Sequence, residues 1–118
     1  MFTPFLTTGI GSLPHTDREE ACRLILETFD IPFWPQLPKL SFHEFMIPQY
    51  SEGMPFLKID ESRETIWIER DGDDLTQFYE NYTEDLKLAV SENYAKGFYA
   101  FINSIKDNHF LFLKGHVT

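Results

Sequence analysis

A glycine-rich stretch near the N-terminus, TGIGSLPHT at residues 8–16, contains the residue types of a ligand-binding loop. It holds Gly9 and Gly11, and Ser12 directly follows the second glycine. Glycine lets backbone N–H groups approach an anion closely, and a serine hydroxyl adds a neutral hydrogen bond. The stretch is therefore a candidate binding loop, and a simple tight turn is the alternative interpretation.

Three familiar glycine loops do not fit these residues. A dinucleotide fingerprint would need a third glycine at position 14, where the chain has Pro14. A phosphate-binding loop would need Gly-Lys followed by Ser or Thr, which is absent. A nucleophile elbow would need Gly-x-Ser-x-Gly, but Ser12 directly follows Gly11.

Two further stretches follow predicted strands and carry unusual residues. One is FWPQLP at residues 33–38, and the other is GHVT at residues 115–118. Ligands of parallel α/β folds gather at the C-terminal ends of the strands, so these stretches and the first loop predict a shared pocket. A core position is the alternative for the tryptophan. The candidates that these two stretches add to the pocket are Trp34, Gln36, His116 and Thr118.

The secondary elements that would position these residues follow from hydrophobic spacing and breaker residues. The expected strands are Phe5–Thr8, Ile31–Trp34 and Phe110–Lys114, with a hairpin formed by Phe56–Ile59 and Thr65–Glu69. The expected helices are Asp17–Phe29, Asp73–Tyr82 and Ser91–Lys106, with one or two helical turns at Ser41–Ile47 that Pro48 ends. Thr16 and Glu19 fit a capping box at the start of the first helix.

Core strands that alternate with helices predict a parallel α/β sheet in a single domain, residues 1–118. The sequence given stops after the third predicted strand, Phe110–Lys114, without a helix to cover it. An uncovered parallel edge tends to pair with another chain, so we expect self-association.

Composition excludes several function classes. The net charge of −9 disfavours binding to nucleic acid through a basic face, and no apolar run is long enough to cross a membrane. The single cysteine, Cys22, and the lack of a secretory signal favour the cytoplasm. The four histidines show no metal-ligand spacing with one another or with Cys22, so we expect no metal or other cofactor within this chain.

The first loop resembles the opening of the cobalamin-independent methionine synthase family, which reads Thr-Ile-Gly-Ser-Phe-Pro-Gln-Thr at this point. Residues 33–38, 94–101 and 114–118 look like a bacterial subgroup of that family. The resemblance implies an eight-stranded TIM barrel, of which this chain would cover the first three βα units with an inserted β-hairpin, leaving the barrel incomplete. The wider group includes uroporphyrinogen decarboxylase-like barrels.

The resemblance also implies a reaction, the transfer of a methyl group from a methyl donor to a zinc-bound thiol such as homocysteine, as in methionine biosynthesis. It assigns Ile10, Gly11 and Ser12 to the amino-acid end of the thiol substrate. Gln36 stands where the family places a glutamate that binds the substrate amine, and His15 stands where it has a glutamine. The zinc ligands lie in later strands of the family barrel, so this segment is expected to be inactive alone.

Two alternatives to this interpretation remain. One is part of a uroporphyrinogen decarboxylase-like or corrinoid-linked methyltransferase, although the arginine-rich loop of the porphyrin enzymes has no counterpart near the N-terminus. The other is a non-catalytic oligomeric module that buries its open sheet edge against a copy of itself.

Overall fold

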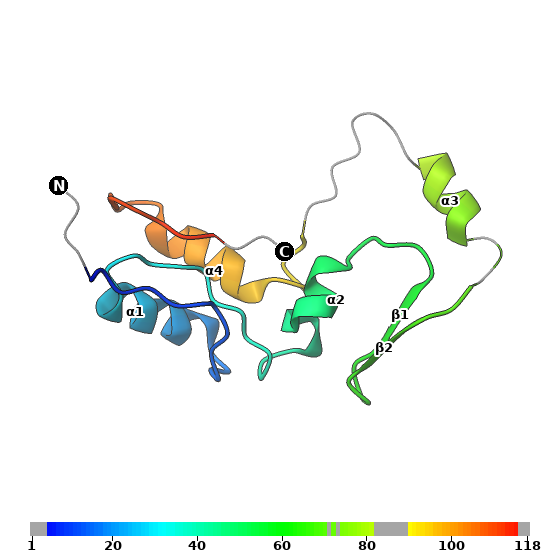
Figure 1. Ribbon diagram of the computed structural model, residues 1–118, viewed down its shortest axis with the longest axis horizontal. Helices are drawn as coiled ribbons and strands as arrows, with labels where there is room; N and C mark the ends of the chain where they lie inside the picture. Colours follow the sequence, from blue (N-terminus) through cyan, green and yellow to red (C-terminus); the bar gives the residue numbers. More distant parts are fainter. Residues whose placement is uncertain (1–4, 71, 73, 82–89, 116–118) are drawn as a thin grey trace.

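The computed structural model describes residues 5–70, 72, 74–81 and 90–115. Within these residues, Figure 1 shows short helices joined by long extended segments, and one β-hairpin. The elements are α1 (Arg18–Thr28), η1 (Phe42–Glu44), α2 (Met46–Tyr50), β1 (Leu57–Asp60), β2 (Thr65–Ile68), α3 (Asp74–Asn81) and α4 (Lys96–Ile105).

Helix α1 confirms the helix predicted at Asp17–Phe29, and it buries Ala21, Cys22 and Ile25. The predicted capping box is wrong. Asp17 is the N-cap, and its carboxylate accepts the backbone N–H groups of Glu19 and Glu20. A carboxylate at a helix N-terminus also interacts favourably with the helix dipole. The hydrogen bond from Glu20 is the main cause that lowers the pKa of Asp17.

The expected hairpin is present. Strands β1 and β2 pair antiparallel, with Leu57 opposite Ile68 and Asp60 opposite Thr65. Within the turn, the side chain of Asp60 accepts the backbone N–H of Ser62 at 3.0 Å. Aspartate side chains commonly stabilise tight turns by accepting a backbone N–H two residues further along the chain. Helix α3 agrees with the prediction over residues 74–81, and the two end residues of that prediction lie outside the described residues.

The predicted fold class is wrong. The only sheet in the described residues is the two-stranded hairpin, and three βα units of a TIM-barrel-type fold do not form there. The three segments expected as core strands are extended, but only two isolated parallel bridges join them, Ser12 with Gln36 and Phe33 with Lys114.

Proline explains why no continuous ladder forms between these segments. The middle segment contains Pro32, Pro35 and Pro38, none of which has a backbone N–H to donate. Pro32 therefore contributes only its carbonyl, which accepts the N–H of Lys114 at 2.9 Å. The segments lie side by side but do not become regular strands.

Helices α1 and α4 pack against each other, and the extended segments run alongside them (Figure 1). The buried residues of the core cluster are Cys22, Trp34, Ala100 and Phe101. The rings of Trp34 and Phe98 meet edge to face, with their centroids 5.5 Å apart. Burial raises the pKa of the Cys22 thiol to about 11, so this cysteine is a small core residue and not a thiolate.

Helix α4 begins at Lys96, five residues later than the predicted Ser91. Residues 91–95 form a turn instead, in which Ser91 accepts the N–H groups of Tyr94 and Ala95. Pro48 lies within the first turn of α2 and does not end a helix before it, because a proline there removes no intrahelical hydrogen bond. The hairpin and α3 extend away from the helix pair (Figure 1).

Candidate functional site

The Gly9–Ser12 loop is held against the middle extended segment by backbone hydrogen bonds. Gln36 donates its N–H to the carbonyl of Gly11 at 2.8 Å and accepts the N–H of Leu13 at 3.0 Å. Thr7, which precedes the loop, donates both its backbone N–H and its hydroxyl to the carboxylate of Asp30, each at 2.9 Å. These contacts fix both ends of the loop, and the Thr7 backbone hydrogen bond is the main cause that lowers the pKa of Asp30.

Both glycines of the loop have structural reasons to be glycine. Gly11 has φ of 142°, a conformation that residues with a side chain rarely adopt. A Cβ on Gly9 would come within 2.5 Å of the Phe33 ring. Steric demands at these two positions therefore account for the Gly-x-Gly spacing and for the path of the chain between them.

The loop leaves hydrogen-bond donors unused. Within the described part of the chain, no acceptor pairs with the backbone N–H groups of Ile10, Gly11 and Ser12 or with the Ser12 hydroxyl. Ile10 is 88% exposed and Ser12 is also exposed, so an outside ligand can reach these two residues, whereas Gly11 between them is buried. Free backbone N–H groups in succession are donors of a kind that suits an anion.

Lys114 adds a positive charge to the loop. Its ammonium group, half-buried, donates to the carbonyl of Gly9 at 2.7 Å. No carboxylate among residues that the structure describes pairs with it. An ammonium has three donors, so two are left for a ligand. Sequence reasoning missed Lys114, because nothing local signals a contact across 105 positions of sequence.

The structure separates the other predicted site residues. Gln36 is 7% exposed and is paired with Ser12, so it adjoins the loop. Trp34 is 8% exposed and packs in the cluster with Cys22 and Phe101, which agrees with the core interpretation of this residue. His116 and Thr118 lie outside the described residues. The structure thus brings Ile10, Gly11, Ser12 and Gln36 together.

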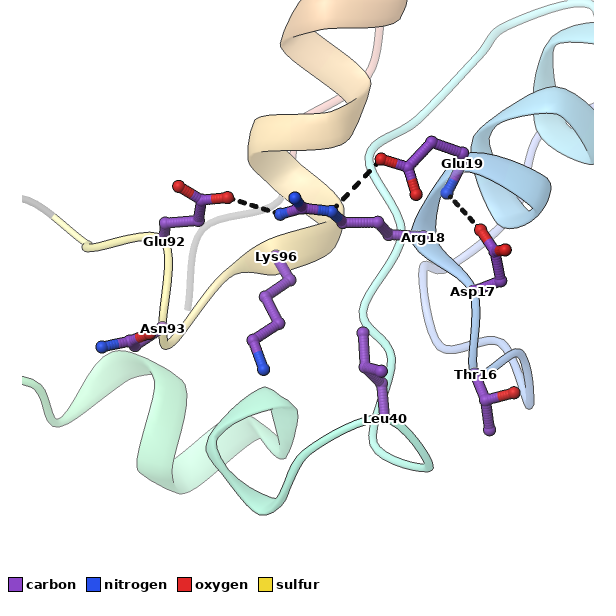
Figure 2. A pocket seen from close by; sticks show the side chains of 8 residues that line it. All are labelled: Thr16, Asp17, Arg18, Glu19, Leu40, Glu92, Asn93 and Lys96. Atoms are coloured by element: carbon purple, nitrogen blue, oxygen red, sulfur yellow. Dashed lines mark hydrogen bonds and ion pairs between the residues drawn. The ribbon is translucent and has the colours of Figure 1, made fainter.

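A separate cavity of about 430 Å³ lies where the N-terminal ends of α1 and α4 meet (Figure 2). The residues that line it are Thr16, Asp17, Arg18, Glu19, Leu40, Glu92, Asn93 and Lys96. Arg18 is already paired with Glu92 at 2.5 Å and with Glu19 at 3.3 Å. The carboxylates that line this cavity outnumber its basic groups, so the cavity is less suited to an anion than the Gly9–Ser12 loop is.

The residues present do not fit a zinc site. Nowhere in the described residues do three or more His, Cys, Asp or Glu side chains gather in a way that could hold a metal ion. The single cysteine is a buried thiol with a raised pKa, whereas zinc binds the thiolate. Among the described helices, none has the length and apolar character needed to cross a membrane.

Comparison with known proteins gives no further assignment. No protein-family model, no curated protein and no solved structure matches this chain. The candidate site therefore stands on its own geometry, in which the loop contacts the Lys114 ammonium through Gly9 and the Gln36 backbone through Gly11 and Leu13.

Proposed function

We propose that this chain is the N-terminal segment of a methionine synthase-like methyltransferase that binds the carboxylate of a small, homocysteine-like thiol substrate. Ile10, Gly11 and Ser12 supply neutral donors, and Lys114 supplies the charge. The observation that carries the proposal is the group of three unused backbone N–H groups beside an ammonium that has no carboxylate partner among the described residues.

The proposal gives this segment a binding role and no chemical step. Hydrogen bonds to a charged partner are shorter and about twice as strong as neutral ones, so the lysine contributes the most to affinity for an anion. The hydroxyl and backbone N–H groups add direction, because a carboxylate has about four acceptor sites. Methyl transfer by the 118-residue chain above a no-enzyme control would contradict this division of roles.

Variants of the loop test the proposal by their affinity for homocysteine, measured by ligand-observed NMR. We expect Lys114→Met to weaken binding by at least about tenfold, since a charge-assisted hydrogen bond contributes about 1.5–3 kcal/mol. Ser12→Ala should weaken it by about threefold to tenfold, the range for a neutral hydrogen bond. Lys106→Met removes an exposed lysine at the end of α4 and serves as the matched control. Equal affinity in all four proteins would refute the assignment.

Self-association is a second proposal, and it has its own supporting observation. In the third extended segment, Leu111 is 78% exposed and Leu113 is 47% exposed. The backbone of this segment pairs with the segment that contains Pro32 and Phe33 through the N–H of Lys114. An exposed apolar segment of this kind suits a second copy of the chain.

Light scattering at tens of micromolar protein tests this second proposal. We expect a dimer or a larger species, and we expect Leu111→Lys to shift it towards the monomer because a charge on an edge opposes pairing. Arg23→Lys, at an exposed position on α1, is a control that keeps the charge. A monomer at every concentration would rule out the oligomeric module.

A further inference from the structure

A cavity of about 490 Å³ is lined jointly by the β1–β2 hairpin, by η1 and by the turn that precedes α4. Three of its lining residues carry rings and three carry apolar chains: His43, Trp67 and Tyr94, and Met54, Leu57 and Ile59. Small-molecule sites have volumes of about 300–1,000 Å³, so this cavity is large enough for a small organic compound. None of its lining residues belongs to the Gly9–Ser12 loop or to the cavity of Figure 2, so it is independent of the proposed function.

Trp67 is the most exposed of the three rings. Its side chain is 44% exposed, whereas His43 and Tyr94 are half-buried. Its indole N–H donates to Glu69 Oε2 at 3.3 Å, which places a carboxylate beside the indole. Within the described part of the chain, the indole contacts no other ring. Tryptophan has the strongest attraction for a cation among the aromatic side chains, and this ring is open to one.

Tyr94 and His43 form a second aromatic wall that is held in place by its neighbours. Their rings meet edge to face, with centroids 4.4 Å apart. His43 Nδ1 pairs with the carboxylate of Glu61 in the hairpin turn, and the carbonyl of Tyr94 accepts the Gln49 amide at 3.0 Å. A ligand that enters the cavity therefore meets rings that are already positioned, which lowers the entropic cost of binding.

The charge around the cavity favours a cation. Glu69 lines the cavity directly, and Lys58 is the one lysine or arginine among its described lining residues. Burial raises the pKa of Tyr94, and the negative charges of Glu52 and Glu61 raise it further, so both carboxylates act on this wall. Three carboxylates thus oppose one ammonium group, and the chain as a whole has a net charge of −9. A positively charged ligand is attracted by this field and an anion is repelled.

We propose that this cavity binds a small organic cation with a methylated ammonium head, held by the rings of Trp67 and Tyr94 and by the carboxylate of Glu69. Aromatic rings recognise quaternary ammonium groups through cation–π attraction. The methyl groups of such a head also pack against the apolar chains of the lining, which a small hydrated metal ion cannot do. The rest of the compound extends along Met54 and Leu57.

Choline and its uncharged carbon analogue 3,3-dimethylbutan-1-ol test the proposal, because they differ in charge and hardly in shape. The readout is the indole N–H signal of Trp67 in the ¹⁵N-labelled 118-residue chain. We expect a saturable shift with choline, and binding at least about fivefold tighter than that of the analogue. The indole signal of Trp34, which is buried in the core cluster, should not move.

Variants of the lining separate the charge from the rings. Glu69→Gln keeps the shape of the side chain and should weaken choline binding by at least about threefold, with no effect on the analogue. Glu64→Gln makes the same change at an exposed position of the hairpin turn and is the matched control. Lys58→Met should strengthen choline binding, because it removes the positive charge that competes with the ligand. Trp67→Leu should abolish the preference for choline over the analogue.

Several results would overturn the assignment. They are equal affinity for choline and its analogue, a saturable shift that leaves the Trp67 indole unmoved, and the same choline affinity in Glu69→Gln as in Glu64→Gln. If a short peptide with trimethyl-lysine bound about tenfold more tightly than choline, the cation would come from a protein side chain and the assignment to a small compound would be wrong.

Discussion

Replacing Gly97 with alanine is expected to destabilise the chain by about 2 kcal/mol, measured by urea unfolding. Gly97 lies in the first turn of α4, where a Cβ would collide with the backbone carbonyl oxygen of Pro35 and come within 3.0 Å of its carbonyl carbon. Overpacking of this kind costs about 1–3 kcal/mol or more, and it exceeds the gain in helix propensity of about 1 kcal/mol. The middle extended segment would have to move away from α4.

Gly115→Ala provides the control for this experiment. No atom lies within 4 Å of a Cβ built on Gly115, so its stability is expected to change by less than about 0.5 kcal/mol. Equal stability of Gly97→Ala and the wild type would show that α4 does not approach Pro35 as closely as described.

Replacing Glu44 with leucine is expected to lower the free energy of unfolding by about 3 kcal/mol near pH 4. The change leaves the N–H groups of Leu37 and Lys96 and the amide of Gln49 without their acceptor. Each buried donor without a partner costs about 1–3 kcal/mol, and α4 also loses its cap. The measurement is again urea unfolding, with Glu52→Leu as the control.

The loss should become smaller as the pH rises. Burial raises the pKa of Glu44, and the hydrogen bonds from Leu37 and Lys96 only partly oppose this effect. The folded chain therefore holds the Glu44 proton more tightly than the unfolded chain does. This contribution to wild-type stability is complete below the ordinary pKa of 4.5 and is lost as the pH rises through the raised pKa of the folded state. A loss that grows with pH would contradict this account.

Local signals in the sequence predicted part of the fold. The three- and four-residue spacing of Cys22, Ile25 and their neighbours located α1, and the charged turn between two alternating stretches located the hairpin. Both depend on contacts close in sequence. The capping box failed because Thr16 and Asp17 are both good N-caps, and spacing alone favoured the wrong one.

Long-range contacts decided what the sequence did not predict. The parallel sheet was expected from apolar stretches, but the prolines of the middle segment cannot donate the hydrogen bonds that a ladder needs. The start of α4 depends on Glu44, which is 52 positions away. No periodicity within residues 91–106 carries that information.

The residues of the candidate site also fall into those that the sequence identified and those that only the structure revealed. The loop residues Gly11 and Ser12 and their neighbour Gln36 were identified from residue types and from the family resemblance, and the structure places them side by side. Lys114 was not identified, since it joins the loop through a contact between distant segments. The positive charge beside the loop is therefore a property of the folded chain.

The measurement that tests the central claim most directly is a titration of the ¹⁵N-labelled chain with homocysteine, followed by the backbone amide shifts. We predict saturable shifts at Ile10, Gly11 and Ser12, and none at Arg18 in the cavity of Figure 2. Shifts at Arg18 with an unchanged loop, or no saturable shift at all, would contradict the assignment of the carboxylate site to this loop.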